Sequence, residues 1–447
     1  MRGIPGSTST CRRGLLAAGC VVLMLVAGGC PDTGGEPNAC NCDPTQSDSP
    51  PVFHNATDPT NDGATYIGSK ACSACHADIY DITRLHGHTH ALTKIDGAPP
   101  EYPAEASRAG VPNPPAGKAW SDIAYVISGY LHCGYFIDSD GFLMTTGIDG
   151  VNTKWLLDFP ANGTAAGFVP FLSDQATPLP YDYDTCFKCH TTGPQPQDPA
   201  DPRSQDSRRG ILGTWAEPGV TCEACHGPGS KHAPNPQKRN IFVDSTPQTC
   251  GRCHVRGDDA NTIVTTPDGF IDGNTQVAEL RASGGHGQFT CMICHNPHAS
   301  MNYDRDRALR NDCTDCHRDQ NMAFHEGFVY RLGDYEETLS CKSCHMPLAA
   351  KNSTSAPASL VGPVARVGDV HSHIFRIDPD HVHFDDMFTP DGSAVLKDDQ
   401  GRAGLSPAFV CIRCHNNAPG LFPLTPSGAA NIARGMHERA ANQAANP

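Results

Sequence analysis

Cysteine and histidine recur along this chain in one fixed order: two cysteines separated by two residues, with a histidine directly after the second. The stretch from Gly219 to His232 shows the pattern at Cys222, Cys225 and His226. Thiols at this spacing can add to the two vinyl groups of one porphyrin, and the next histidine can then bind its iron. His232, beyond a Gly-Pro-Gly turn, is a second imidazole on a short tether. The pattern is typical of covalent attachment of c-type haem.

The pattern occurs eight times, whereas this cysteine and histidine content would give on the order of 0.05 matches by chance. Sixteen of the 22 cysteines are thereby assigned, and the sequence predicts eight covalent haem c groups. Paired Cys-x-x-Cys units also build structural zinc sites, but zinc has no need of a histidine after every pair. In chain order, attachment motifs 1 to 8 are Cys72-Cys75-His76, Cys186-Cys189-His190, Cys222-Cys225-His226, Cys250-Cys253-His254, Cys291-Cys294-His295, Cys313-Cys316-His317, Cys341-Cys344-His345 and Cys411-Cys414-His415.

The composition favours a fold built around cofactors. Leu, Ile, Val and Phe together make up about 18% of the chain and the net charge is −15, a balance that without cofactors would favour disorder. Eight apolar macrocycles would replace much of the usual aliphatic core. With 44 Gly and 38 Pro, we expect a mostly irregular fold in which short α-helices carry the motifs and loops wrap between them. The acidic balance argues against nucleic acid as a partner.

Residues 1–29 are typical of a signal peptide. Arg12 and Arg13 precede the apolar run Leu15–Ala27, which is too short for a good membrane span. The small residues before Cys30 resemble the cleavage box of bacterial lipoproteins, in which that cysteine carries a lipid. Ordinary signal cleavage is the alternative. Either route predicts an exported chain, at the outer membrane or cell surface or outside the cell, with the periplasm as the alternative.

Residues 30–62 are rich in Pro, Asp, Thr, Ser and Asn and are expected to form a flexible tether. In an oxidising compartment Cys40 or Cys42 could pair with Cys133, but the connectivity does not follow from sequence. His54 precedes motif 1. It is either a solvated loop residue or a ligand that reaches an iron in a neighbouring chain.

The long segment between motifs 1 and 2 predicts a small β-module near residues 120–160. Ile123–Ile127 and Tyr135–Met144 are expected to be strands, the second folding into a hairpin. We expect the module to pack against the first haem. Asp138 and Asp140 either form the turn, which is favoured, or hold calcium. His132 near this module is either a packing residue or a feature peculiar to this protein.

Several segments of the first half resemble one known family. They are Tyr66–Leu92, Gly97–Pro103, Pro114–Tyr130, Thr185–Gly193 and Cys250–Gly257. Over residues 66–257 the chain is similar to the outer-surface tetrahaem cytochromes that stack into extracellular filaments, and the phrase that begins at Gly219 is shared with cytochrome c-554-like proteins. A Ser-Gly-His segment of that family supplies a distal iron ligand and aligns with His86-Gly87-His88, so the resemblance implies His88 as a ligand.

Histidines outside the motifs are the candidates for second iron ligands. Subtracting the eight motif histidines leaves 22 − 8 = 14, so every iron could bind two imidazoles. His373 is favoured over His371, since alternate residues of an extended segment face opposite sides, and the choice between His381 and His383 stays open. His437 lies in a predicted helix, 431–439, that could fold back on motif 8. The proposed second ligands are His54, His88, His232, His286, His298, His325, His373 and His437.

The expected organisation is a signal peptide (1–29), a tether (30–62), a tetrahaem-like region (63–257) with a β insert (115–180), and a C-terminal four-haem region (258–447). Irons with two imidazoles keep both ligands on changing oxidation state, whereas substrate chemistry needs an open position. No motif departs from Cys-His. The sequence therefore favours an electron conduit without catalytic residues, exchanging electrons with other redox proteins and able to assemble into filaments. The alternative is an octahaem oxidoreductase of the hydroxylamine, nitrite or tetrathionate type, with one open haem.

Overall fold

The computed structural model describes residues 63–437, apart from 244–245, 258, 321, 323–324 and 417–420. The predicted signal peptide and tether, with Cys30, Cys40, Cys42 and His54, lie outside the described residues. All described elements belong to one compact unit within Pro50–Pro447. In the described ranges, no helix is long and apolar enough to cross a membrane.

Every attachment motif lies on or directly beside a short helix, as the sequence predicts. A helical turn places residues i and i+3 on one side, so both thiols of a motif face the same way. Helices this short are not stable alone, so they depend on tertiary contacts. They are α1 (Ser69–Cys72), α4 (Lys188–His190), α5 (Cys222–His226), α6 (Pro247–Gly251), α8 (Cys291–Cys294), α10 (Cys313–Cys316), α11 (Cys341–His345) and α13 (Pro407–Val410).

Other helices connect the motifs. The helix directly after motif 1 is α2 (Ala77–Thr83), and the C-terminal helix α14 (Pro426–Ala433) begins earlier than the predicted 431–439. A π-helical turn, η4 (Tyr183–Phe187), leads into motif 2. The remaining α-helices among the described residues are α3 (Thr146–Asp149), α7 (Gln276–Arg281), α9 (Arg305–Ala308) and α12 (Ala358–Val361).

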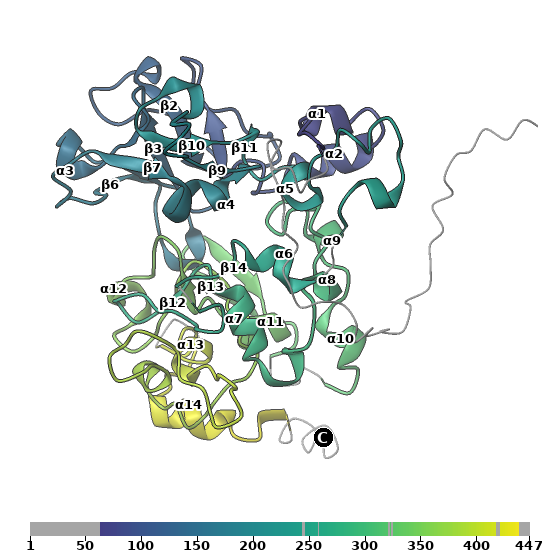
Figure 1. Cartoon of the computed structure of the whole chain (residues 1–447). Coiled ribbons are helices and arrows are strands. Elements are labelled where there is room, and N and C mark those ends of the chain that lie inside the picture. Colours follow the sequence, from purple (N-terminus) through teal and green to yellow (C-terminus); the bar gives the residue numbers. More distant parts are fainter. Residues whose placement is uncertain are drawn as a thin grey trace, which may run out of the picture. The chain divides into compact units, whose positions relative to one another are not determined.

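A nine-stranded sheet occupies residues 92–214 and is larger than the predicted β-module (Figure 1). The added strands have only two to four residues, too few for periodicity to reveal them. Only the β7–β10 pair of this sheet is parallel within the described residues. In spatial order the strands are β1 (Leu92–Lys94), β2 (Ile123–Ser128), β3 (Cys133–Asp138), β4 (Phe142–Leu143), β7 (Leu179–Asp182), β10 (Ile211–Thr214) and β9 (Gln195–Pro196), with β5 (Lys154–Leu156) paired to β3 and β6 (Gly167–Val169) to β5.

Three two-stranded sheets complete the strand inventory of the described residues. β8 (Thr191–Thr192) pairs with β11 (Glu217–Pro218) next to motif 2. The other two are formed by β12 (Ile271–Asp272) with β15 (Ala350–Lys351), and by β13 (Val329–Leu332) with β14 (Tyr335–Thr338).

The predicted hairpin is present and its turn is closed by acidic side chains. β2 and β3 are antiparallel, with Ile127 opposite Tyr135. The Asp138 carboxylate accepts the N–H groups of Asp140 and Phe142, both at 2.9 Å. Asp140 in turn pairs with a guanidinium at 2.8 Å. Both carboxylates are therefore engaged by the chain itself, which favours the turn over the calcium site.

The core of the β-module includes part of motif 2. Phe187, between the two cysteines of that motif, is fully buried against Tyr181, Ile211 and Trp215, and Cys186 packs against the same cluster. The sequence predicted packing against the first haem. The second motif forms part of this core because Phe187 contributes its ring to it.

Two carboxylates, buried Glu223 and half-buried Glu217, join motif 1 to motif 3. Glu223 is 2% exposed and accepts the N–H groups of Ile67 at 3.0 Å, Gly68 at 2.8 Å and Gly229 at 2.7 Å. Glu217 accepts both the N–H and the hydroxyl of Ser69. These bonds hold α1 against α5.

Replacing Glu223 with Gln should destabilise the protein by about 3 kcal/mol, because the amide NH₂ faces buried N–H donors that then lack an acceptor. The measurement is the denaturant midpoint of the haem-loaded protein by circular dichroism. The matched control is Glu105→Gln, at a solvent-exposed ion pair with Arg84, which should shift the midpoint far less. Equal shifts for the two variants would contradict this role of Glu223.

Candidate haem sites

All motif cysteines and histidines line one continuous cavity of about 3730 Å³. A site for one small molecule usually measures ~300–1,000 Å³, so this cavity has room for several large groups. The second-ligand candidates within the described residues line it as well: His88, His232, His286, His298, His325, His373 and His437.

Seven motif histidines each face a second imidazole. Two imidazoles bonded at about 2 Å to opposite sides of one metal hold their ring centres roughly 6 Å apart. The pairs found here match that separation, so the residues fit an iron between two rings. The ring-centre distances are 6.4 Å for His76–His232, 6.0 Å for His254–His88, 6.1 Å for His226–His298, 6.2 Å for His295–His373, 5.8 Å for His317–His286, 5.8 Å for His345–His437 and 6.4 Å for His415–His325.

Zinc sites would need a different arrangement. A structural zinc ion takes four ligands in a tetrahedron, yet no three Cys, His, Asp or Glu side chains in the described ranges converge in a way that could hold a metal ion. The two-ring geometry therefore favours haem over zinc.

The second ring at a motif comes from a segment of the chain outside that motif. His232, which follows motif 3, faces motif 1, and His298, which follows motif 5, faces motif 3. His286, which precedes motif 5, faces motif 6, and His325, which follows motif 6, faces motif 8. The histidine pairs thus connect segments that are distant in sequence.

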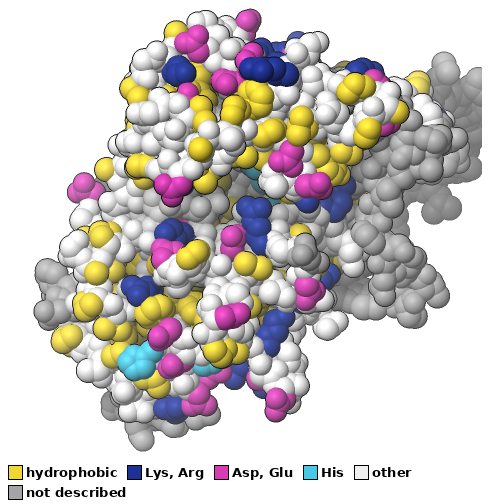
Figure 2. Space-filling model, turned by 60° about the vertical axis from the view of Figure 1, so that its left-hand side comes forward, with side chains coloured by type: hydrophobic (Ala, Val, Ile, Leu, Met, Phe, Trp, Pro, Cys, Tyr) yellow, Lys and Arg dark blue, Asp and Glu magenta, His cyan; other side chains and the backbone are white. Residues whose placement is uncertain are grey.

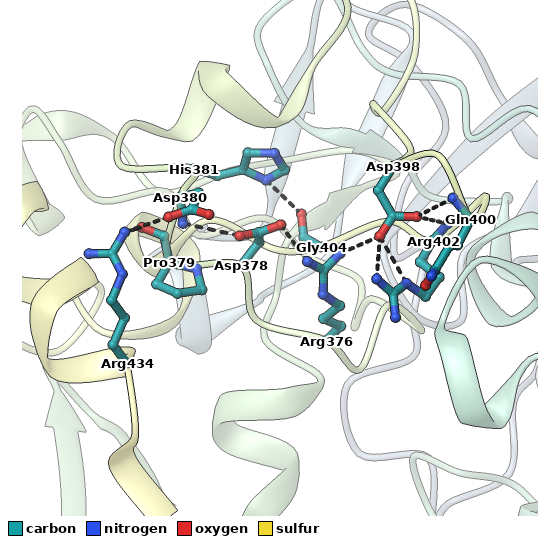
Figure 3. Close-up of polar contacts among 10 residues, drawn as sticks. All are labelled: Arg376, Asp378, Pro379, Asp380, His381, Asp398, Gln400, Arg402, Gly404 and Arg434. Carbon is teal, nitrogen blue, oxygen red and sulfur yellow. Dashed lines mark hydrogen bonds and ion pairs between the residues drawn. The ribbon is translucent and has the colours of Figure 1, made fainter.

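His437 faces motif 7, not motif 8 as the sequence predicted. Ion pairs lie on the chain near this histidine (Figure 3). Arg434, directly after α14 and three residues before His437, pairs with Asp380 at the surface. In the neighbouring segment Arg376 bridges Asp378 and Asp398.

Contacts between motifs show which of them are neighbours in space. Glu223 of motif 3 holds the chain just before motif 1, and Arg252 of motif 4 donates to the Ala224 carbonyl of motif 3 at 2.9 Å. Sγ atoms of motifs 2 and 4 contact each other's main-chain carbonyls. The N–H of Arg310, three residues before motif 6, donates to the Cys294 carbonyl of motif 5 at 2.9 Å. The thiols of motifs 4 and 5, of motifs 6 and 7, and of motifs 7 and 8 lie near enough to interact electrostatically. These contacts order the motifs as 1-3-4-5-6-7-8, with motif 2 beside motif 4.

Helix α7 supports the histidines of motifs 4 and 5. The side-chain oxygen of Gln276 contacts Nδ1 of His254 at 3.1 Å. Glu279, fully buried, accepts the Ser372 hydroxyl and the main-chain N–H of His373, both at 2.7 Å. Burial raises the pKa of Glu279. No sequence pattern marked these two residues, because their roles depend on contacts across the fold.

His190 of motif 2 is the exception among the motif histidines. Its Nδ1 contacts the carbonyl of Ala91 at 3.0 Å, but no second histidine ring faces it within the described residues. Burial lowers the pKa of His190, and the positive charge of Arg256 lowers it further. His54, the candidate ligand not found in any pair, lies outside the described residues.

The remaining described histidines are held by local contacts. His86 stacks on His88 at 4.3 Å, and burial lowers its pKa to about 4. Nδ1 of His132 lies 3.7 Å from the Asp369 carboxylate. His90 stacks on Tyr130, His371 contacts the Met346 carbonyl, and His381 contacts the Gly404 carbonyl (Figure 3); His383 is exposed.

Comparison with known proteins identifies the class. The family model described as cytochrome c554 and c-prime matches residues 175–227, which include motifs 2 and 3. The chain is 23% identical over 279 residues to the dissimilatory sulfite reductase MccA of Wolinella succinogenes, covering 51% of this chain and 38% of that protein. The match thus spans less than half of that relative. The chain is a multihaem c-type cytochrome, as the sequence resemblance implied.

Similar solved structures are also cytochromes of this class. They are the outer cell wall cytochrome OcwA (18% identity, 86% of this chain and 92% of that one, TM-score 0.45), the octahaem sulfite reductase MccA of Wolinella succinogenes (13%, 85% and 70%, 0.49), and the undecahaem cytochrome from the S-layer of Carboxydothermus ferrireducens (18%, 89% and 63%, 0.42).

A buried ion pair joins motifs 7 and 8. Arg413, within motif 8, is 5% exposed in its side chain and binds Glu337 through two nitrogens at 2.9 and 3.2 Å. Glu337 also accepts the Ser343 hydroxyl of motif 7 at 2.6 Å. Burial alone would raise the pKa of Glu337, but the charge and hydrogen bonds of Arg413 outweigh it and lower the pKa to about 2.

The stabilisation from Glu337 should be complete above the ordinary carboxyl pKa near 4.5 and disappear as the pH falls through about 2. Glu337→Gln should cost roughly 3–5 kcal/mol at pH 7, since it leaves the Arg413 charge buried and unpaired. Thermal midpoints of the two proteins from pH 7 down to pH 2 provide the measurement. The difference between them should shrink towards pH 2, and a constant difference would contradict the pairing.

Proposed function

We propose that this protein is an exported octahaem c-type cytochrome that conducts electrons along closely packed haems, seven of them bound by two imidazoles. The seven histidine ring pairs carry the proposal. An iron held by two strong, unchanging ligands has no position for substrate and reorganises little on reduction. Haem iron, alternating between its ferric and ferrous states, supplies the redox chemistry.

The protein's own residues set the route. The motif thiols would hold each porphyrin. The neighbouring motifs support a route in the order 1-3-4-5-6-7-8, with motif 2 as a branch at motif 4. Motifs 1 and 6 are the most exposed: Cys75, His76, Cys316 and His317 all lie at the surface. Electrons would enter and leave there, through contact with other redox proteins.

The face seen in Figure 2 carries positive and negative side chains interspersed, without a region of one sign. Such a surface suits brief contact with redox partners better than binding to a strongly charged polymer. We place the protein at the outer membrane or cell surface, or outside the cell, anchored by a lipid on Cys30 where the leader is processed as that of a lipoprotein.

Motif 2 supports a second candidate function, an octahaem oxidoreductase with one open haem. His190 has no second ring among the described residues, and Arg256, which pairs with Asp272 at 3.4 Å, lines the same cavity. A haem with one free position there could bind nitrite, tetrathionate or hydroxylamine. The name of one relative, dissimilatory sulfite reductase, also supports this class.

His54 separates the two candidates. In a conduit that assembles into filaments, His54 of a neighbouring copy would supply the missing ligand at motif 2. In an enzyme, that position would stay free for substrate. The same haem is therefore either a junction between chains or a reaction centre.

Low-temperature electron paramagnetic resonance of the oxidised protein tests these functions. The conduit predicts eight low-spin haems in the wild type, and His54→Ala should convert one haem's worth to high spin and abolish filaments. His383→Ala is the matched control and should change nothing. A wild-type high-spin signal of one haem that nitrite shifts would instead favour the enzyme, and several high-spin haems would contradict both functions.

A further inference from the structure

We infer that the haem of motif 5 has the most positive reduction potential in the series, so that electrons collect in the middle of the protein. The inference rests on the proposed conduit. It follows from what the second nitrogen of each axial imidazole contacts. A histidine bound to iron through Nε2 carries its proton on Nδ1, and the acceptor of that proton tunes the ring as a ligand.

Most buried motif histidines have a strong acceptor at Nδ1. A carbonyl oxygen receives the N–H bond of His226 at 2.9 Å, His345 at 2.8 Å and His415 at 3.0 Å. His190 and His254 contact the carbonyl of Ala91 and the amide oxygen of Gln276. His76 and His317 of motifs 1 and 6 are exposed.

Motif 5 differs from the other motifs with a printed Nδ1 contact in what its own histidine meets. Nδ1 of His295 contacts the thioether sulfur of Met301 at 3.3 Å, and a thioether is a weak acceptor. Nδ1 of the opposing His373 is buried and has no partner in hydrogen-bond geometry among the described residues, although the main chain of His371 lies near its ring. Glu279 binds the main-chain N–H of His373, not its ring.

The direction of the shift in reduction potential follows from the basicity of the imidazole ligands. A strong acceptor at Nδ1 gives the imidazole more negative character, which favours the ferric ion and lowers the potential. The two rings of motif 5 lack a strong hydrogen-bond acceptor at Nδ1, so the ferrous ion is relatively favoured. The positive charge of nearby Arg305 acts in the same direction. Reduction here adds one electron to iron and requires no proton.

Because the haem of motif 5 lies between two others, its more positive reduction potential affects the direction of electron transfer. The thiols of motif 5 neighbour those of motifs 4 and 6, so electrons arriving from either side would reach it. Its neighbour at motif 4 has a strong acceptor in Gln276. The step from motif 4 to motif 5 would therefore be downhill for an electron.

Reciprocal substitutions in the haem-loaded, full-length protein test the inference by spectroelectrochemical titration. Met301→Gln gives His295 a strong acceptor. The reduction potential of the most positive component should then become more negative, by roughly tenfold in the equilibrium constant for reduction, ~59 mV for one electron. Met301→Leu removes the sulfur and should leave that component in place or shift it positive. Gln276→Met should leave the most positive component in place and shift a lower one positive.

An unchanged most positive component in Met301→Gln, or the same negative shift in Met301→Leu, would overturn the inference. Electron paramagnetic resonance of each variant should retain the low-spin signals, which shows that ligation is intact. A wild type with several high-spin haems would instead contradict the proposed conduit, so the two failures are distinguishable.

Discussion

The pairing of two imidazoles at seven of the eight motifs is the interaction on which the rest of the structure depends. The paired histidines are between 31 residues apart, for His286 and His317, and 166 apart, for His88 and His254. An iron bound by such a pair closes a long loop, and seven of these loops interlock along the series of motifs. A chain with many glycines and prolines and short helices gains little order from local structure. Haem loading and folding should therefore be coupled, as in other proteins whose ligands come from distant segments.

Buried polar side chains also hold those segments together. Glu223 joins motifs 1 and 3, Arg413 and Glu337 join motifs 7 and 8, and helix α7 reaches the histidines of motifs 4 and 5. Each of these three contacts is a small set of buried hydrogen bonds. A buried donor or charge without a partner would destabilise the fold. The spacing of the redox centres thus depends on carboxylates and guanidinium groups as much as on apolar packing.

The attachment motifs could be predicted from the sequence, whereas the motif that each second histidine faces could not. Spacing alone identified the motifs and the short helices that carry them, and all seven described candidates for second ligands lie in ring pairs. Which motif each one faces depends on the fold, as the contact of His437 with motif 7 demonstrates. The sheet was underestimated because strands of two to four residues leave no periodic pattern. Gln276 and Met301 belong to no motif, so their contacts with axial histidines could be found only in three dimensions.

Near-infrared magnetic circular dichroism of the fully oxidised, haem-loaded protein tests the central claim most directly, because the charge-transfer band of a low-spin ferric haem reports its two axial ligands. The paired rings predict that at least seven haems show the band of bis-imidazole ligation. The eighth, at His190, should show the same band only where another chain supplies its histidine. Bands of histidine–methionine or histidine–amine ligation at two or more haems would contradict the account.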